Sequence, residues 1–121
     1  MQHSEAFLKL VDASRARIRE TSVDDVSRRL QAGEKLTLVD VREDGEWQKG
    51  HIQGAVHLGK GIIERDAESK FPDKGRELIL YCGGGFRSAL AADALQQMGY
   101  TNVISMDGGW RAWSEKKLPT E

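Results

Sequence analysis

The chain has 121 residues, of which 39% are hydrophobic and 31% charged, with a formal net charge of −1. This length predicts one domain that can bury a core without a disulfide or a structural metal. Charges of both signs are interspersed, without the basic stripe typical of nucleic-acid binding, and the apolar runs are too short to cross a membrane, so we expect neither as a partner.

The first third of the chain predicts two helices and one strand. Residues 4–17 place apolar side chains at helical spacing with polar ones between, which predicts an amphipathic helix. A short strand is expected over 18–21. Ser22 and Asp25 then have the spacing of a capping box, which opens a helix that ends near Gly33.

The middle of the chain predicts a buried strand followed by weaker elements. The run LTLVDV over 36–41 is largely apolar and rich in β-branched residues, as expected for a strand covered on both faces. A short polar helix is expected over 43–49 and a brief strand over 55–58. Residues 59–75 are consistent with either a helix or a loop.

The last part alternates strands and helices. Strands are expected over 77–82 and 103–106, and helices over 88–99 and 110–117. Such alternation predicts an α/β fold with a parallel sheet covered by helices on both faces. Ligands of such sheets bind at the carboxyl ends of the strands, and Cys82 lies at such an end.

Cys82 is the only cysteine of the chain, and the residues after it predict an anion-binding loop. Three glycines follow, then Phe86, Arg87 and a helix that begins near Arg87 or Ser88. Glycines allow positive φ angles that turn amides inward, and the helix N-terminus and Arg87 add positive charge. All three favour a thiolate and would seat a negative sulfur bound to it. A cysteine alone at a strand end is more often a core residue; the combination favours a reactive one, without naming the reaction.

This loop resembles the active-site loop of the rhodanese (sulfurtransferase) family. Three further segments resemble family motifs in the family's order: DVRE at 40–43, GHIQGA at 50–55 and MDGGWRAW at 106–113. The resemblance covers roughly residues 18–117. It implies a single rhodanese domain with a central parallel five-stranded sheet and helices on both faces.

The same resemblance divides the chain into a domain over 18–117, an amphipathic helical extension over 1–17 and a tail over 118–121. It implies that Cys82 is the sulfur-carrying nucleophile. The amides around its persulfide would come from Gly83, Gly84, Gly85, Phe86, Arg87 and Ser88.

The chemistry implied by the resemblance is a two-step transfer of sulfane sulfur. A donor such as thiosulfate or a low-molecular-weight persulfide loads Cys82, and a thiol, cyanide or sulfite removes the sulfur. No metal or other cofactor is implied. Because the chain has one cysteine, the acceptor must come from outside, and an acceptor protein is a further expected partner.

One cysteine also cannot form an intramolecular disulfide, and the N-terminal residues do not resemble a signal peptide, so we expect a cytoplasmic location. The loop departs from the family pattern in one respect. Members that use thiosulfate usually carry cationic side chains at the positions of Gly83 and Gly84. Arg87 is then the only loop cation, which leaves a glutathione or protein persulfide as an alternative donor.

Several residues outside the loop are candidates for supporting it. Asp40 and Arg42 lie just past a predicted strand, where they either brace the loop or form a structural ion pair. Trp110, beside a predicted turn, could line the pocket. His51 is expected to pair with a carboxylate, with Glu46 the candidate, and lacks the spacing of a metal site.

Two other functions remain open. Cysteine-loop phosphatases and arsenate reductases also seat an oxyanion on backbone amides, but their loops resemble a pattern with five residues between Cys and Arg. Here four residues intervene, and Tyr81 stands where those enzymes usually have His. A non-catalytic module that binds anions, carries sulfur or recognises a partner is the other alternative.

Overall fold

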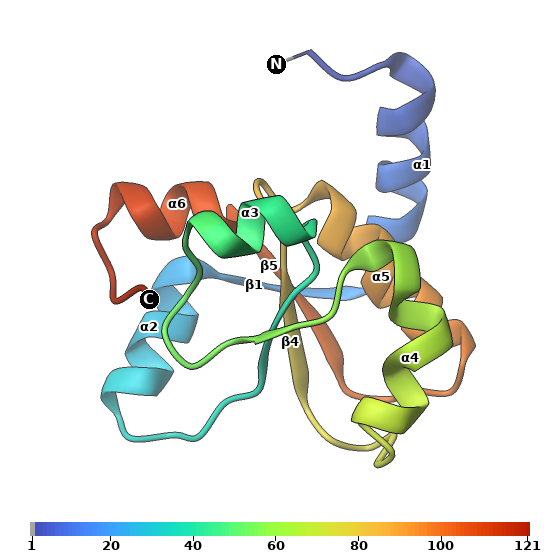
Figure 1. Ribbon diagram of the computed structural model, residues 1–121. Coiled ribbons are helices and arrows are strands. Elements are labelled where there is room, and N and C mark those ends of the chain that lie inside the picture. The colour runs from blue at the N-terminus through green and yellow to red at the C-terminus, as the bar shows by residue number, and fades with distance from the viewer. Residues whose placement is uncertain (1) are drawn as a thin grey trace.

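The computed structural model describes residues 2–121 and contains one five-stranded sheet with helices around it (Figure 1). Met1, part of the predicted extension over 1–17, lies outside the described residues. Among the described residues, no helix is long and apolar enough to cross a membrane. The strands are β1 (Arg19–Ser22), β2 (Leu38–Asp40), β3 (Val56–His57), β4 (Leu78–Tyr81) and β5 (Val103–Asp107). The helices are α1 (Glu5–Arg15), α2 (Val23–Gln31), α3 (Asp44–Lys49), a 3-10 turn η1 (Lys60–Ile62), α4 (Ile63–Lys70), α5 (Phe86–Gln97) and α6 (Gly109–Glu115).

The five strands are all parallel and lie in the order β1-β5-β4-β2-β3. Central strand β4 pairs with β2 and β5, so Leu80 lies beside both Val39 and Ser105. The predicted α/β fold with a parallel five-stranded sheet is therefore confirmed. Because the strands are parallel, their carboxyl ends meet at one edge, and the segments after β2 and β4 become neighbours there.

Each face of the sheet packs on a different group of helices. Val39 and Leu80 belong to a core shared with α4 and α5. Their chain neighbours Leu38 and Ile79 point to the other face, in a core with α2 and α6 that includes Trp113. Successive strand residues point to opposite faces, so burial on both sides explains why these strands are continuously apolar.

Helix boundaries differ from the predictions where glycine conformation decides them. Helix α5 begins at Phe86, slightly earlier than predicted, because Gly85 takes a left-handed conformation with φ of +105° and turns the loop directly into the helix. Helix α6 begins at Gly109, which the sequence placed in a turn.

Ser22 caps α2 as predicted, accepting a hydrogen bond of 3.0 Å from the Asp25 amide. Residues 59–75, left open as helix or loop, contain η1 and α4.

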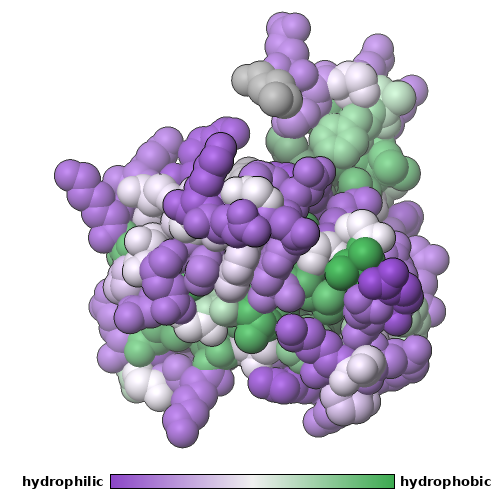
Figure 2. Space-filling view, in the orientation of Figure 1, coloured by the Kyte–Doolittle hydropathy of each residue, from purple (hydrophilic) through white to green (hydrophobic). Residues whose placement is uncertain are grey.

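The N-terminal helix α1 packs against α5, and its first turns rise above the rest of the molecule (Figure 1). Apolar side chains gather on this raised part (Figure 2), where Leu8 and Leu10 are exposed. The last turn of α1 is fixed to α5 through Asp93. The buried Asp93 carboxylate accepts a hydrogen bond from Ser14 Oγ at 3.1 Å and pairs with the Arg17 guanidinium at 2.6 Å.

Replacing Asp93 should loosen α1 in a pH-dependent way. Hydrogen bonding to Arg17 lowers the pKa of Asp93, so the carboxylate stabilises the fold at neutral pH, and this contribution is lost as the pH falls through the lowered pKa. We expect Asp93→Asn to reduce the free energy of unfolding by about 1 to 3 kcal/mol at neutral pH.

Urea denaturation of wild type and Asp93→Asn across the acidic range measures this difference. Asp24→Asn is a matched control, because its pair with Lys116 is exposed and should change stability by about 0.5 kcal/mol or less. A gap between wild type and Asp93→Asn that stays constant down to strongly acidic pH would contradict the account.

Candidate functional site

Cys82 follows β4 and is 1% exposed. Among residues 2–121, two backbone N–H groups donate to its sulfur: Gly85 N lies 3.1 Å and Ser88 N 3.4 Å from Sγ. Ser88 Oγ lies 3.6 Å from the same sulfur and 2.8 Å from Ser105 Oγ. These donors belong to the loop and the first turn of α5, where the helix dipole also favours negative charge. Of the six loop residues predicted to supply amides, Gly85 and Ser88 do so within residues 2–121, whereas the amides of Gly83, Gly84, Phe86 and Arg87 make no hydrogen bond to the sulfur.

The sequence predicts that the three glycines take positive φ angles and turn their amides inward. Of the three, only Gly85 has a positive φ, so the inward turn of the amides depends on Gly85 alone. Gly83 instead leaves room for a cation, whereas a side chain at Gly84 would meet no close neighbour. A Cβ at Gly83 would lie 3.2 Å from Arg87 Nη2, and one at Gly84 would lie 4.0 Å from Arg111 Nη1.

Helix α6 fixes the backbone of the loop by hydrogen bonds to its carbonyl groups. Its Trp110 amide donates to the Cys82 carbonyl at 2.8 Å, and its Arg111 amide donates to the Gly83 carbonyl at 3.0 Å. Gly109 permits this approach, because a Cβ there would collide with the Cys82 carbonyl oxygen. The loop carbonyls are therefore satisfied away from the sulfur, which leaves N–H groups to face it.

The Arg87 guanidinium is bound by a carboxylate from α3. Its Nη1 and Nη2 lie 2.7 and 3.1 Å from the two carboxylate oxygens of Glu46. This pair lowers the pKa of Glu46 and raises that of Arg87, to which the neighbouring Cys82 sulfur also contributes. The one cation of the loop is thus already paired in this structure.

His51 pairs with a carboxylate, as predicted, but the partner is Glu121 and not Glu46: His51 Nε2 lies 3.9 Å from Glu121 Oε2. His51 Nδ1 lies 3.1 Å from the Trp47 carbonyl oxygen, and its ring stacks on the Trp47 indole at 3.4 Å between centroids. Glu46 could have been found from the sequence only by placing its helix, which follows β2, beside the loop that follows β4.

Buried Asp40 and Arg42 and half-buried Trp110 form a cluster beside the loop. The Asp40 carboxylate accepts from Arg42 Nη2 at 2.7 Å and from the Arg42 amide at 2.9 Å. Arg42 Nη2 also donates to the Gly50 carbonyl at 2.7 Å, and its guanidinium lies 4.7 Å from the Trp110 ring centroid. Asp40 and Arg42 therefore form an ion pair, which is one of the two alternatives that the sequence allows for them. Trp110 contacts the loop through its backbone and does not line the pocket described next.

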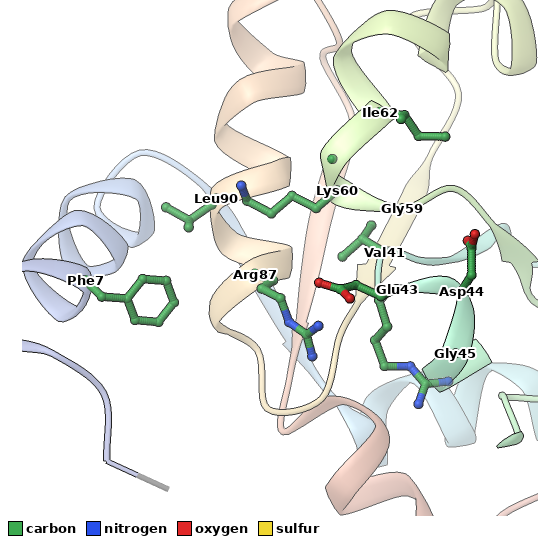
Figure 3. A pocket seen from close by; sticks show the side chains of 12 residues that line it. Phe7, Val41, Glu43, Asp44, Gly45, Gly59, Lys60, Ile62, Arg87 and Leu90 are labelled. Carbon is green, nitrogen blue, oxygen red and sulfur yellow. The ribbon is translucent and has the colours of Figure 1, made fainter. Parts of the chain in front are cut away.

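A pocket of about 670 Å³ lies beside this site. In Figure 3, Arg87 and Leu90 of α5 lie between Phe7 of α1, on the left, and Glu43 with Asp44, on the right. Arg87 lines the pocket and also adjoins Cys82, so it connects the two. Phe7 comes from the predicted extension, and sequence reasoning did not assign it to the site because nothing in its local pattern distinguishes a core-facing from a pocket-facing aromatic residue.

Comparison with known proteins agrees with this geometry. The sequence model of the rhodanese-like domain matches residues 22–116. A putative sulfurtransferase of Bacillus subtilis, YtwF, is 35% identical over 102 residues, which cover 84% of this chain and 96% of that protein. Some curated relatives are much longer: the chain spans 23% of one and 52% of another.

Two solved structures show how far the fold likeness extends. A polysulfide-sulfur transferase homodimer from Wolinella succinogenes is 27% identical, with a TM-score of 0.78 over 96% of this chain and 87% of that one. A protein of unknown function from Rhodopseudomonas palustris, called a possible tyrosine phosphatase, is also 27% identical, with a TM-score of 0.86 over 100% of this chain and 98% of that one. The family match over most of the domain and the cysteine loop at the end of β4 lead to the same conclusion: the chain belongs to the rhodanese-like domain family.

Proposed function

We propose that this chain is a sulfurtransferase that carries sulfane sulfur as a persulfide on Cys82. The observation that supports this most is the pair of N–H groups, from Gly85 and Ser88, directed at a buried sulfur. A buried anionic sulfur needs such donors, because water does not reach it. The relatives named sulfurtransferase support the same reaction class.

The reaction proceeds in two balanced steps. The Cys82 thiolate attacks the outer sulfur of the donor, a new S–S bond forms, and the donor's own S–S bond breaks. The leaving group is sulfite when thiosulfate is the donor, and a thiolate when an organic persulfide is the donor. In the second step a thiol, cyanide or sulfite attacks the outer sulfur of the Cys82 persulfide, which restores the thiolate. Neither step uses a metal or another cofactor.

The protein groups have separate parts in this scheme. The Gly85 and Ser88 amides stabilise the inner sulfur. The Cys82 thiol donates to Ser88 Oγ, and once the thiol is ionised this hydroxyl, which also contacts Ser105 Oγ, can donate to the sulfur. Arg87 stands beside the sulfur and supplies a cation for an anionic donor. An acceptor protein could take the sulfur in place of a small molecule, because the chain has no second cysteine to receive it.

Replacing Cys82 tests the proposed reaction. We expect the wild type to transfer sulfur from thiosulfate or glutathione persulfide to cyanide, measured as thiocyanate, and Cys82→Ser to fall to the rate without enzyme. Turnover of an aryl phosphate by the wild type without sulfur transfer would instead favour the phosphatase alternative, to which the possible tyrosine phosphatase from Rhodopseudomonas palustris also points. Transfer that survives in Cys82→Ser would contradict a Cys82 carrier.

Removing the charge of Glu46 should improve the use of thiosulfate. The Glu46 carboxylate pairs with Arg87 and repels a dianionic donor near Cys82. We expect Glu46→Gln to raise kcat/KM for thiosulfate roughly fivefold, the equivalent of about 1 kcal/mol for a partly exposed pair.

Glu77→Gln is the matched control, because Glu77 pairs with Arg29 away from the site and should leave kcat/KM unchanged. A fall in thiosulfate use in Glu46→Gln would mean that Glu46 serves mainly to position Arg87, and would contradict the repulsive role.

A further inference from the structure

The pocket beside Arg87 is much larger than a small inorganic donor needs. Its volume of about 670 Å³ is in the range of sites for organic ligands. It lies at the carboxyl end of β2 and at the first turns of α5, next to the cysteine loop but not over the sulfur itself. A ligand that fills it can therefore extend one end past Arg87 to Cys82.

The lining of the pocket has an apolar side and two kinds of charge. Phe7 of α1, Leu90 of α5 and Ile62 of η1 supply apolar surface. Glu43 and Asp44 supply negative charge near the N-terminus of α3 (Figure 3). A lining of this kind suits an organic molecule with an apolar stem and charged ends better than a bare anion.

Three cations line the pocket: Arg42, which is paired with Asp40, Arg87 and Lys60, whose side chain extends toward Leu90 (Figure 3). In the described part of the chain, the lysines that form ion pairs are Lys74 and Lys116. Lys60 is half-buried and keeps its charge available for a ligand carboxylate. Arg87, by contrast, is bound to Glu46.

Helix α1 is held in place by the cysteine loop itself. The ring of Phe86 meets the rings of His3 and Phe7 edge-on, at centroid distances of 4.8 and 6.2 Å. The Arg15 guanidinium lies 5.1 Å from the same ring. Phe7 thus contacts the loop through Phe86 and also lines the pocket, although α1 lies outside the matched residues 22–116.

We propose that this pocket binds the organic part of a carboxylate-bearing thiol or persulfide of about tripeptide size, with Phe7 and Lys60 as specificity-determining residues. The proposal rests on the proposed sulfur transfer and names the substrate class of that site. Phe7 and Leu90 cover the stem of the ligand, Lys60 binds a carboxylate, and Glu43 and Asp44 face an ammonium group. The sulfur end of the ligand points past Arg87 toward Cys82.

Binding of S-methylglutathione, which has these groups but no reactive thiol, tests the site without turnover. In titration calorimetry we expect the full chain to bind it, and Phe7→Ala and Lys60→Ala each to weaken binding roughly tenfold. Leu10→Ala and Lys9→Ala are matched controls, because both residues are exposed on α1 outside the pocket, and should bind as the wild type does. Phe7→Leu, which keeps an apolar side chain, should bind more tightly than Phe7→Ala.

Kinetics give a second readout. We expect Phe7→Ala to raise KM for glutathione persulfide roughly tenfold with little change in kcat, and to lower kcat/KM for glutathione persulfide far more than kcat/KM for thiosulfate. An equal loss for both donors would overturn the proposal, because it would mean that Phe7 only supports the loop. Absence of binding to the wild type, or equal binding by all variants, would overturn it as well. Calorimetry does not depend on turnover, so this failure is distinguishable from a failure of the proposed sulfur transfer.

Discussion

Burial of the Cys82 sulfur is the constraint on which the rest of the site depends. A sulfur without contact to water can carry negative charge only if the protein supplies hydrogen-bond donors. Gly85 and Ser88 supply two, at 3.1 and 3.4 Å. They can do so because Gly85 turns the chain directly into α5 and because α6 takes up the carbonyls of Cys82 and Gly83. Two helix N-termini thus hold opposite sides of the same loop.

Charge around the loop is balanced by pairs that differ in accessibility. Arg42 and Asp40 are both buried, and Arg42 also donates to the Gly50 carbonyl, so the pair fixes the backbone there. Arg87 and Glu46 are only partly buried, and a pair in that position costs less to separate. Under the proposed function, an anionic substrate would compete with Glu46 for Arg87, which would favour donors that gain affinity from contacts elsewhere in the pocket.

The fold and the central cysteine were predictable because they depend on short-range patterns. Apolar runs such as Leu78–Tyr81, alternating with helical spacing, define the parallel sheet and place Cys82 at the end of a strand. The partners of the loop were not predictable in the same way. Glu46 reaches Arg87, and Phe7 reaches Phe86, only through the packing of α3 and α1, which spacing along the chain does not encode. The same holds for Gly85, which alone of three identical neighbours takes a positive φ.

The most direct test of this account is the intact mass of the protein after incubation with glutathione persulfide or thiosulfate. With a single cysteine in the chain, any added sulfur has one expected position. The account predicts that the wild type gains one sulfur atom, that cyanide removes it, and that Cys82→Ser gains none. A wild type that gains no sulfur from either donor, or a Cys82→Ser protein that gains as much as the wild type, would contradict it.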